Sequence, residues 1–433
     1  MRKTIFKRLE AQGLIVNYNR LRKNRPRRLP KRVFIWDETI WEGEQIPSVY
    51  LTYVERVKLA KMLDEIGVSI ITVGYPAMSD EEKNSVRRIT NETFEQASLA
   101  APAYIEKNEV DACLDAGIRE IGIFTPFNEL NLQYKLKMSK DEVLKKTVET
   151  IEYAKSHDVT VDFVLEDATR TPIQDILQIF EASVKAGADR LVIADTVGFL
   201  RPLSTRYLLT HIRKGLNDLG INVPLSIHCH NDFGLATANT LTAIEEGITY
   251  PHTCVAGFGG RAGIAPFEEV VTALEILYDV NTGINVKKLY RLSQLVEKIF
   301  ALPIQFHKPI VGENAFSFEW NKHAHGIPAH SMLHNPFPPE MIGRENILYL
   351  GRNTDRQTIE ALLTFAGIKA TPMQINEIFR RVSQKVVDKG EAQMTFYQIK
   401  KLMKDLRRGL SERDFWNVVE EVTRQKPKIP VQT

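Results

Sequence analysis

Short runs rich in β-branched residues alternate with amphipathic runs from Val33 onward. In Tyr53–Gly67 the apolar residues recur near the helical period, whereas Ser69–Tyr75 has the composition of a short strand. This alternation continues to Leu277 and implies parallel strands joined by right-handed crossovers. The predicted strands are Val33–Ile40, Ser69–Tyr75, Gln96–Ala101, Glu120–Thr125, Val159–Leu165, Arg190–Asp195, Pro224–His230 and Thr253–Gly257.

Eight strand–helix pairs over about 250 residues favour a closed (β/α)8 TIM barrel, an α/β fold. A doubly wound sheet is the alternative, but no glycine-rich dinucleotide fingerprint follows the first strand. The predicted barrel helices are Tyr53–Gly67, Asp80–Ile89, Lys107–Ala116, Lys140–Ser156, Pro172–Ala186, Pro202–Leu216, Thr237–Gly247 and Phe267–Leu277.

The chain outside the barrel divides into three further segments. Residues 1–32 form a basic N-terminal extension, and the barrel takes residues 33–280. We expect residues 281–351 to be an irregular linker and residues 352–433 to be a small helical C-terminal domain. The helices expected in that last domain are Ile359–Ala366, Gln374–Lys389 and Tyr397–Arg407.

Composition narrows the class of protein. With 43% hydrophobic and 26% charged residues and a net charge of +3, the 433-residue chain is typical of a globular enzyme, not of a nucleic-acid binder. Met1–Arg32 differs, since it holds twelve Lys or Arg and one acid; a solvated extension, a partner-binding arm and a nucleic-acid contact all remain open. Three unclustered cysteines indicate neither a disulfide framework nor a zinc cluster, which favours the cytoplasm, and no apolar run reaches membrane-spanning length.

The end of the predicted seventh strand carries His228 and His230, and active sites of such barrels lie at the C-terminal ends of the strands. Alternate residues of a strand point to the same side, so the two imidazoles face one way. They form half of a metal site. Two histidines that only hydrogen-bond within the barrel mouth are the structural alternative.

The end of the predicted first strand is unusually acidic. Glu42, next to Gly43, is the residue that we assign as the metal carboxylate, whereas a solvated loop accounts for Glu44 and Glu38. Two imidazoles and a carboxylate leave coordination positions open for substrate oxygens, which suits polarisation of a carbonyl group. The ligand types leave Mg, Mn, Zn and Fe open.

Other strand ends are also polar, and the last one is rich in glycine. Glu166–Arg170 follows the fifth strand, Asp195–Gly198 the sixth and Gly257–Gly263 the eighth. Glycines let a backbone approach a ligand closely, so Gly257 and Gly259 could help to hold a phosphate or an oxyanion. A tight turn is the alternative.

Together these motifs resemble the 2-isopropylmalate synthase and homocitrate synthase family, from about Val33 to Arg408. The family's first-strand signature D-x-T-L-R-[DE]-G-x-Q stands here as Asp37–Gln45, and its H-x-H-N-D-x-G-x-A-x-A-N as His228–Asn239. Several motifs in the family's order make a chance match improbable. Further matching segments are Tyr134–Leu136, Glu166–Arg170, Asp195–Gly198, Gly257–Gly263, Val311–Phe316 and Met341–Gly351.

The resemblance implies a reaction and a set of roles. In the family an acyl-CoA is deprotonated at its methyl carbon, the carbanion attacks the ketone of a metal-bound 2-oxo acid, and the thioester is hydrolysed. By resemblance Glu42, His228 and His230 hold the metal, and Glu166 is catalytic. The implied substrate-binding residues are Trp41, Gln45, Thr72, Asn128, Thr196, Gly257 and Gly259.

A linker histidine of a partner subunit assists proton transfer in the family, but the linker motif fails here. His323 and His325 are the catalytic candidates, and the spacing also leaves His330 open. A histidine-rich surface loop is the alternative. The family's linker and helical lobe reach across a dimer, so the resemblance implies a homodimer.

Departures from the family gather around the substrate. Trp41 stands where the family's first motif has an arginine. In the family that arginine donates to the 2-oxo acid and to the developing enolate oxygen. Losing such a donor typically raises the activation barrier by about 3–4 kcal/mol. Other family residues are replaced at Thr72, Ala101, Asn131 and Gly260. We therefore expect an atypical substrate, more apolar or aromatic because of Trp41, Tyr75 and Phe127. A metal-dependent lyase or hydrolase and a non-catalytic homologue remain the alternatives.

Overall fold

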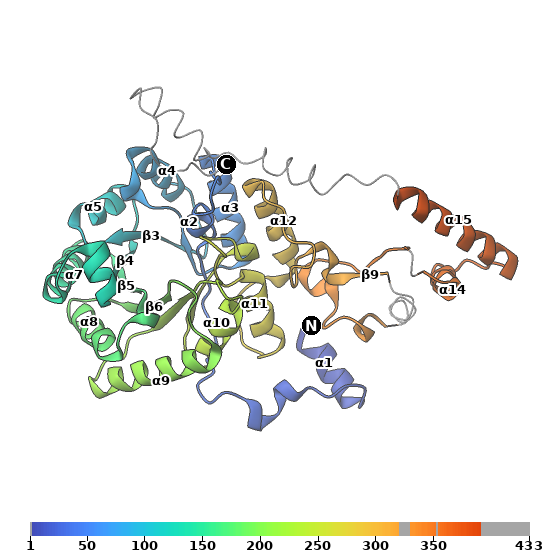
Figure 1. Ribbon diagram of the computed structural model, residues 1–433, viewed down its shortest axis with the longest axis horizontal. Helices are drawn as coiled ribbons and strands as arrows, with labels where there is room; N and C mark the ends of the chain where they lie inside the picture. The colour runs from blue at the N-terminus through green and yellow to red at the C-terminus, as the bar shows by residue number, and fades with distance from the viewer. Residues whose placement is uncertain (1, 320–329, 352–353, 391–433) are drawn as a thin grey trace. The chain divides into compact units, whose positions relative to one another are not determined.

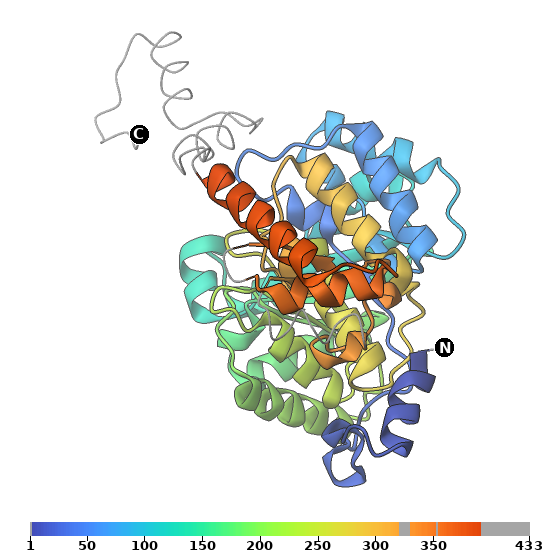
Figure 2. The same cartoon turned by 90° about the vertical axis from the view of Figure 1, so that its right-hand side faces the viewer.

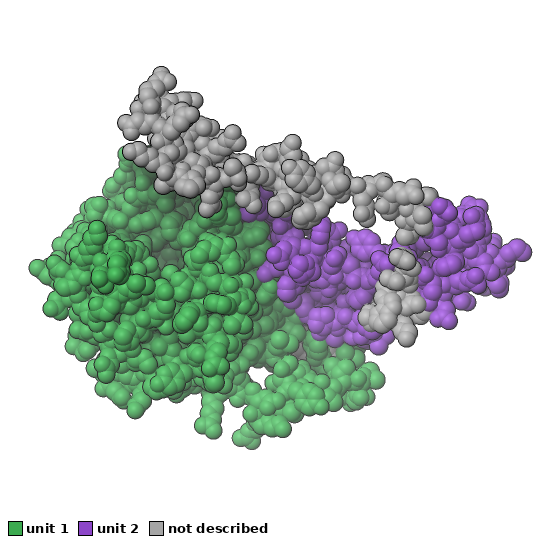
Figure 3. All heavy atoms as spheres, viewed as in Figure 1, with its two compact units in different colours: residues 1–285, 408–433 green, residues 286–407 purple. Residues whose placement is uncertain are grey.

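The computed structural model describes residues 2–319, 330–351 and 354–390. Within them the chain divides into two compact units, which meet in sequence between Asn285 and Val286 (Figure 3). No helix of the described residues is both long and apolar enough to cross a membrane.

The first unit is a closed barrel of parallel strands in the order β1 to β8, with helices on its outside (Figure 1). This confirms the predicted (β/α)8 fold. The strands are β1 Trp36–Asp37, β2 Ile70–Thr72, β3 Ser98–Tyr104, β4 Glu120–Pro126, β5 Thr160–Glu166, β6 Arg190–Asp195, β7 Leu225–Cys229 and β8 Tyr250–Thr253.

Eight long helices alternate with the strands, and buried apolar residues on one face of each pack against the sheet. They are α3 Tyr53–Ile66, α4 Asp80–Thr90, α5 Lys107–Asp115, α7 Lys140–Lys155, α8 Ile173–Lys185, α9 Pro202–Asp218, α10 Ala236–Glu245 and α11 Phe267–Ile276. Among the described residues of this unit, three further α-helices lie outside this alternation: α1 Arg2–Ala11, α2 Thr39–Gly43 and α6 Glu129–Asn131.

The first strand is shorter than predicted, because the chain turns into α2 directly after it. The carboxylate of Asp37 accepts hydrogen bonds from the backbone N–H and the hydroxyl of Thr39, both at 2.9 Å. Such local bonds favour a turn over continued pairing. The prediction of one strand over Val33–Ile40 is therefore wrong, and Glu42 lies on a short helix.

The eighth strand begins and ends earlier than predicted. It covers Tyr250–Thr253, whereas Val255–Gly257 is a helical turn in which Ala256 has a φ of 59°. Pro251 has no N–H to donate, yet it pairs with Ile227 of β7, whereas the predicted strand began only at Thr253. The correction matters because it brings His252 into the barrel.

The second unit contains more regular structure than predicted. The helix α12, Leu289–Phe300, lies in the segment that we expected to be irregular, and its buried face includes Leu292, Val296 and Phe300. Two short strands, β9 Ser317–Phe318 and β10 Ile347–Leu348, pair in parallel. The helices α14 Arg356–Phe365 and α15 Pro372–Gly390 pack against each other, as Figure 2 shows in red. The helix predicted at Tyr397–Arg407 lies outside the described residues.

A buried ionic cluster occupies the barrel near the start of the strands. Arg190, at the beginning of β6, lies 2.8 Å from Asp162 and 3.1 Å from Glu120. Its guanidinium also sits 3.9 Å from the ring centroid of Tyr250 and 5.3 Å from that of Trp36. A single cation thus compensates two buried carboxylates directly beside the aromatic residues of the barrel interior.

We predict that Arg190→Leu destabilises the chain by about 3–5 kcal/mol, because it leaves buried carboxylates without a cation. Arg206→Leu is the matched control: Arg206 is half-exposed, pairs with Glu245 and Glu246, and should contribute about 1 kcal/mol or less. Guanidinium unfolding at pH 7 measures both. Equal unfolding midpoints for the two variants would contradict the prediction.

Candidate functional site

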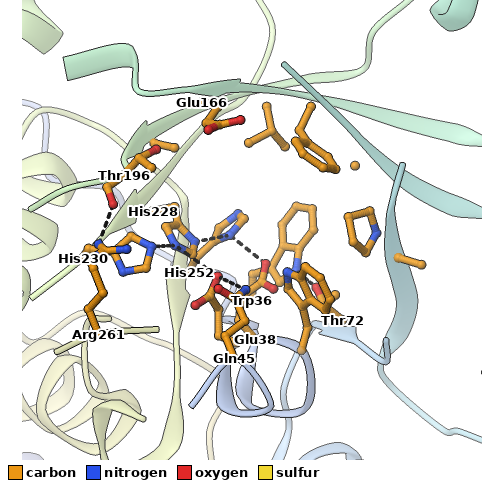
Figure 4. Close-up of a pocket in the computed structure, with 18 of the residues that line it drawn as sticks. Trp36, Glu38, Gln45, Thr72, Glu166, Thr196, His228, His230, His252 and Arg261 are labelled. Carbon is orange, nitrogen blue, oxygen red and sulfur yellow. Dashed lines mark hydrogen bonds and ion pairs between the residues drawn. The ribbon is translucent and has the colours of Figure 1, made fainter. Parts of the chain in front are cut away.

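A cavity of about 290 Å³ opens where the barrel strands end (Figure 4). It is lined by residues from all eight strands or the segments that follow them, which is the expected position of an active site in this fold. The predicted site residues on its wall are Trp41, Glu42, Gln45, Thr72, Glu166, Thr196, His228 and His230.

Glu42, His228 and His230 converge at this cavity and can together hold a metal ion. Nε2 of His228 lies 3.3 Å from Nε2 of His230 and 3.9 Å from Oε1 of Glu42. Strand alternation in β7 turns both imidazoles to one side, and α2 carries Glu42 toward them. The three ligands that the sequence indicated are therefore close enough in space to share one ion.

Neighbouring groups fix the orientation of this triad. Nε2 of Gln45 donates to Oε1 of Glu42 at 2.8 Å, and the N–H of Gly260 donates to Oε2 at 3.4 Å. Nδ1 of His230 lies 3.2 Å from the carbonyl oxygen of Gly263, which leaves Nε2 for a ligand. Because these contacts already orient Glu42 and His230, binding of an ion would require little further ordering of their side chains.

Two further residues, which sequence reasoning did not assign to the site, lie beside the triad. Oε1 of Glu38 is 2.9 Å from Nδ1 of His252, and Nδ1 of His252 is 3.3 Å from Nδ1 of His228. Glu38 is only 6% exposed, so the expectation that it belongs to a solvated loop is wrong. The available signal for Glu38 was strand alternation, since it lies two residues after Trp36.

A hydrogen-bonded chain supports Glu38 from the far side. Nε1 of Trp36 donates to the hydroxyl of Thr72 at 2.8 Å, and that hydroxyl bonds the carboxylate of Glu38. The Trp36 ring also stacks on His252, with ring centroids 4.3 Å apart. Thr72 therefore lines the cavity, where we predicted a substrate contact, but its hydroxyl hydrogen-bonds the carboxylate of Glu38.

Burial shifts the protonation of the whole cluster toward neutral side chains. Desolvation raises the pKa of Glu42 to about 7, with a contribution from the nearby Glu38, and the pKa of Glu38 to about 8. It lowers the pKa of His230 to about 4 and of His252 to about 3, and that of His228 well below its usual range. Neutral imidazoles present free lone pairs, which is the form that binds metal.

One wall of the cavity is aromatic. Trp41 meets Tyr75 edge to face with ring centroids 5.2 Å apart, and Tyr75 packs near Phe124 at 6.2 Å. Trp41 and Phe124 line the cavity directly. Phe127, which we expected at the substrate, is fully buried and absent from the cavity wall, so Phe124 takes that position.

Two cations border the cavity, and each is paired with an acid. Nζ of Lys135 lies 2.7 Å from both carboxylate oxygens of Glu166. Arg261 donates to both oxygens of Asp232 at 2.8 and 2.9 Å, and to the carbonyl oxygen of Thr196 at 2.6 Å. The predicted catalytic Glu166 thus faces the cavity as part of an ion pair.

Other predicted site residues do not line the cavity. Asn128 donates to the carboxylate of Asp167 at 2.6 Å and accepts from the N–H of Asn131, which is a structural arrangement. Gly257 and Gly259 also lie behind the wall, but Gly259 has a φ of 154°, and a Cβ there would come within 3.3 Å of Glu42 Oε2. Its bare Cα makes room for that carboxylate.

The linker histidines divide between described and undescribed residues. His323 and His325 lie outside the described residues. His330 is described, and its Nδ1 accepts a hydrogen bond from the N–H of Met332 at 3.2 Å.

Two regions of the chain match known family models. A family model described as HMGL-like matches residues 32–296, and a second, described as homocitrate synthase post-HMGL domain-like, matches residues 310–391. The first covers the barrel and every candidate ligand named above.

Curated relatives match most of the chain. A 2-isopropylmalate synthase of Methanocaldococcus jannaschii is 39% identical over 390 residues, covering 89% of this chain and 74% of the relative. A probable 2-isopropylmalate synthase of Ignicoccus hospitalis is 41% identical over 82% of this chain and 88% of its own length. An (R)-citramalate synthase of M. jannaschii is 36% identical over 90% of this chain and 75% of its own length.

Among solved structures, the barrel resembles hydroxymethylglutaryl-CoA lyases. That of Pseudomonas aeruginosa has a TM-score of 0.57 and 21% identity, covering 64% of this chain and 96% of the lyase. That of Bacillus subtilis has a TM-score of 0.56 and 22% identity, covering 64% and 96%. At this identity the likeness supports the fold alone.

We predict that Glu38→Gln flattens the pH dependence of stability in the metal-free chain. The pKa of Glu38 is raised in the folded state, so its contribution to stability is fully present at low pH and is lost as the pH rises through about 8. The lowered histidine pKa values act below pH 6.5 and leave this window undisturbed. Between pH 6.5 and 8.5 the native chain should lose about 1–2 kcal/mol more than the variant.

Guanidinium unfolding in the presence of a chelator measures this slope, and Glu149→Gln on the exposed face of α7 serves as the control. Parallel slopes for the native chain and Glu38→Gln would show that Glu38 is already ionised at pH 6.5.

Proposed function

Because the chain belongs to the HMGL-like family, we propose that it is a divalent-metal-dependent enzyme that condenses an acyl-CoA with a 2-oxo acid. The observation that carries the proposal is the convergence of Glu42, His228 and His230 on a cavity at the mouth of the barrel. The names of the relatives, which are 2-isopropylmalate and citramalate synthases, supply the reaction class.

The residues present fit a divalent ion. Two neutral imidazoles and one carboxylate are a donor set used by Mg, Mn, Zn and Fe sites, and the Gln45 and Gly263 contacts supply the outer support that such ligands need. Bound there, the ion would act as a Lewis acid that polarises the carbonyl of the 2-oxo acid. Nitrogen ligands favour Zn or Fe over Mg.

The remaining residues of the cavity would bind substrate and move protons. We propose that Glu166 removes a proton from the methyl carbon of the acyl group, while Lys135 holds its carboxylate at the wall. Thr196 and Gln45 offer neutral polar contacts at the same wall. His323 and His325 stay our candidates for donating the proton to the product oxygen.

The aromatic wall supports an atypical 2-oxo acid. Trp41 and Phe124 provide apolar surface at the cavity, with Tyr75 packed against both rings. Trp41 also offers one neutral N–H where the resembling family has an arginine. A substrate whose side group is apolar or aromatic would bury its surface there. The cations Lys135 and Arg261 at the border can contact the carboxylate that every 2-oxo acid carries.

Two further proposals rest on the resemblance. We propose a homodimer, because the second unit matches the region that reaches across a dimer in the resembling family. We also propose a cytoplasmic location, because Cys113, Cys229 and Cys254 are all buried and free.

We predict that the purified chain, given a divalent metal, releases free thiol from acetyl-CoA in the presence of a 2-oxo acid. A panel of pyruvate, 2-oxoisovalerate and phenylpyruvate tests the side-group preference. Glu42→Gln and His230→Asn should lower kcat/KM by a factor of about 10² or more, because a metal ligand is lost, whereas Glu149→Gln should not. Thiol release that is unaffected by these two variants, or none with any acid of the panel, would contradict the proposal.

We predict that Trp41→Arg changes substrate preference without disturbing the fold. The variant adds a cation and removes aromatic surface, so the ratio of kcat/KM for pyruvate over phenylpyruvate should rise by about tenfold or more. Trp41→Phe is the control, since it keeps the aromatic surface. Unchanged ratios in Trp41→Arg would show that this residue does not contact the side group.

A further inference from the structure

A second set of metal-ligand atoms lies directly beside the first. Glu38, His228 and His252 each offer one atom, and these three atoms all lie within 4.8 Å of one another. All three side chains are buried and come from different strands, β1, β7 and β8, or the residue just after them. His228 belongs to both sets, so the two groups share one imidazole (Figure 4).

The two nitrogens of His228 face different groups. Its Nε2 lies 3.3 Å from Nε2 of His230, whereas its Nδ1 lies 3.3 Å from Nδ1 of His252. Two nitrogens that are each about 2.0–2.1 Å from one zinc ion in a tetrahedral site are separated by roughly this distance. Oε1 of Glu38, at 2.9 Å from Nδ1 of His252, lies close enough to complete the second set.

Protons alone cannot satisfy these contacts. A neutral imidazole has one N–H and one lone pair, and each nitrogen lies in a single direction of the ring plane. When Nε2 of His228 binds an ion, its Nδ1 keeps the proton and must donate it to Nδ1 of His252. That nitrogen then has no proton for Glu38, and a proton on Glu38 would compete for the same lone pair.

Apart from the Thr72 hydroxyl, which bonds the carboxylate of Glu38, no other described group contacts these polar atoms. Nε2 of His252 is buried and has no hydrogen-bond partner among the described residues, so Nδ1 carries the polar contacts of that ring. In the same part of the chain His252 is the only ionic partner that we find for Glu38. A divalent cation would satisfy all three atoms at once, because each can present a lone pair to it.

We propose that a second divalent cation binds between Oε1 of Glu38, Nδ1 of His228 and Nδ1 of His252. His228 then bridges two ions as an imidazolate, and its ring proton passes to solvent when the second ion binds. Two carboxylates and one imidazolate carry three negative charges against four on the ions, and this leaves one positive charge for an anionic ligand. The second site rests on the ion that the proposed function places at Glu42, His228 and His230, but it does not depend on which reaction that ion serves.

Each site has two ligands that the other site lacks, and this allows a direct test with zinc. The full chain is stripped with a chelator, reloaded with Zn²⁺, desalted and analysed for zinc per chain by mass spectrometry. His252→Asn and Glu38→Gln should each lose one equivalent relative to the native chain and keep the equivalent at Glu42. His230→Asn and Glu42→Gln should lose the other one, and the double variant His252→Asn/His230→Asn should lose both.

Each outcome decides the question. An unchanged zinc content in both His252→Asn and Glu38→Gln overturns the second site and leaves the proposed reaction intact. Loss of the same single equivalent in His252→Asn and His230→Asn shows one shared site and also overturns it. Circular dichroism of each variant checks that it has folded, and thiol release from acetyl-CoA is scored separately, so failure of the proposed function is distinguishable.

Copper provides a second readout that does not depend on counting. Two Cu²⁺ ions joined by one imidazolate couple magnetically, so a chain loaded with two should show less than one detectable electron spin per copper. His252→Asn should restore one spin per copper. A full spin count in the copper-loaded native chain would contradict the shared imidazole.

Discussion

The geometry of the site depends on two hydrogen bonds from Thr39 to the carboxylate of Asp37. They end the first strand and start the five-residue helix α2, which brings Glu42 within 3.9 Å of His228. The hydroxyl of Thr39 also accepts from the N–H of Val255, so the same residue joins the end of β1 to the turn after β8. If this segment continued as a strand, its rise of about 3.3 Å per residue would carry Glu42 roughly 13 Å beyond Glu38 and away from His228.

The carboxylates of Glu38 and Glu42 are buried beside that turn, where their charged forms are costly without a bound ion. Desolvation raises the pKa of both Glu38 and Glu42, the nearby Glu38 raises that of Glu42 further, and desolvation keeps the three histidines neutral. The result is a group of donor atoms with little charge of its own, supported from outside by Gln45, Thr72 and Trp36. Such a cluster is stable as a set of neutral groups and becomes strongly attractive to a cation when its carboxylates ionise.

The aromatic wall of the cavity lies next to the proposed ion site and shapes the space for the substrate. Trp41 stands next to Glu42 in the sequence, and its ring faces the cavity together with Phe124. The chemistry at the ion and the shape of the pocket are therefore set by neighbouring residues of one short helix, while the cations Lys135 and Arg261 remain at the border.

Much of the fold was predictable because strand and helix periods alternate so regularly, and the family resemblance drawn from the motifs is confirmed by the matching models and relatives. His228 and His230 could be selected because strand alternation turns them to one side, and Glu42 because it follows the end of the first strand. His252 was missed because the predicted eighth strand began only at Thr253, and Glu38 was missed because its segment was interpreted as a solvated loop although it lies two residues after Trp36. The prediction named Phe127 at the substrate, whereas Phe124 lines the cavity, because the register of β4 decides which ring faces inward.

The most direct test of the account is anomalous X-ray scattering from crystals of the full chain grown with zinc. The account predicts a peak within bonding distance of Nε2 of His228, Nε2 of His230 and a carboxylate oxygen of Glu42. Crystals that hold zinc elsewhere while these three side chains contact only one another would contradict it.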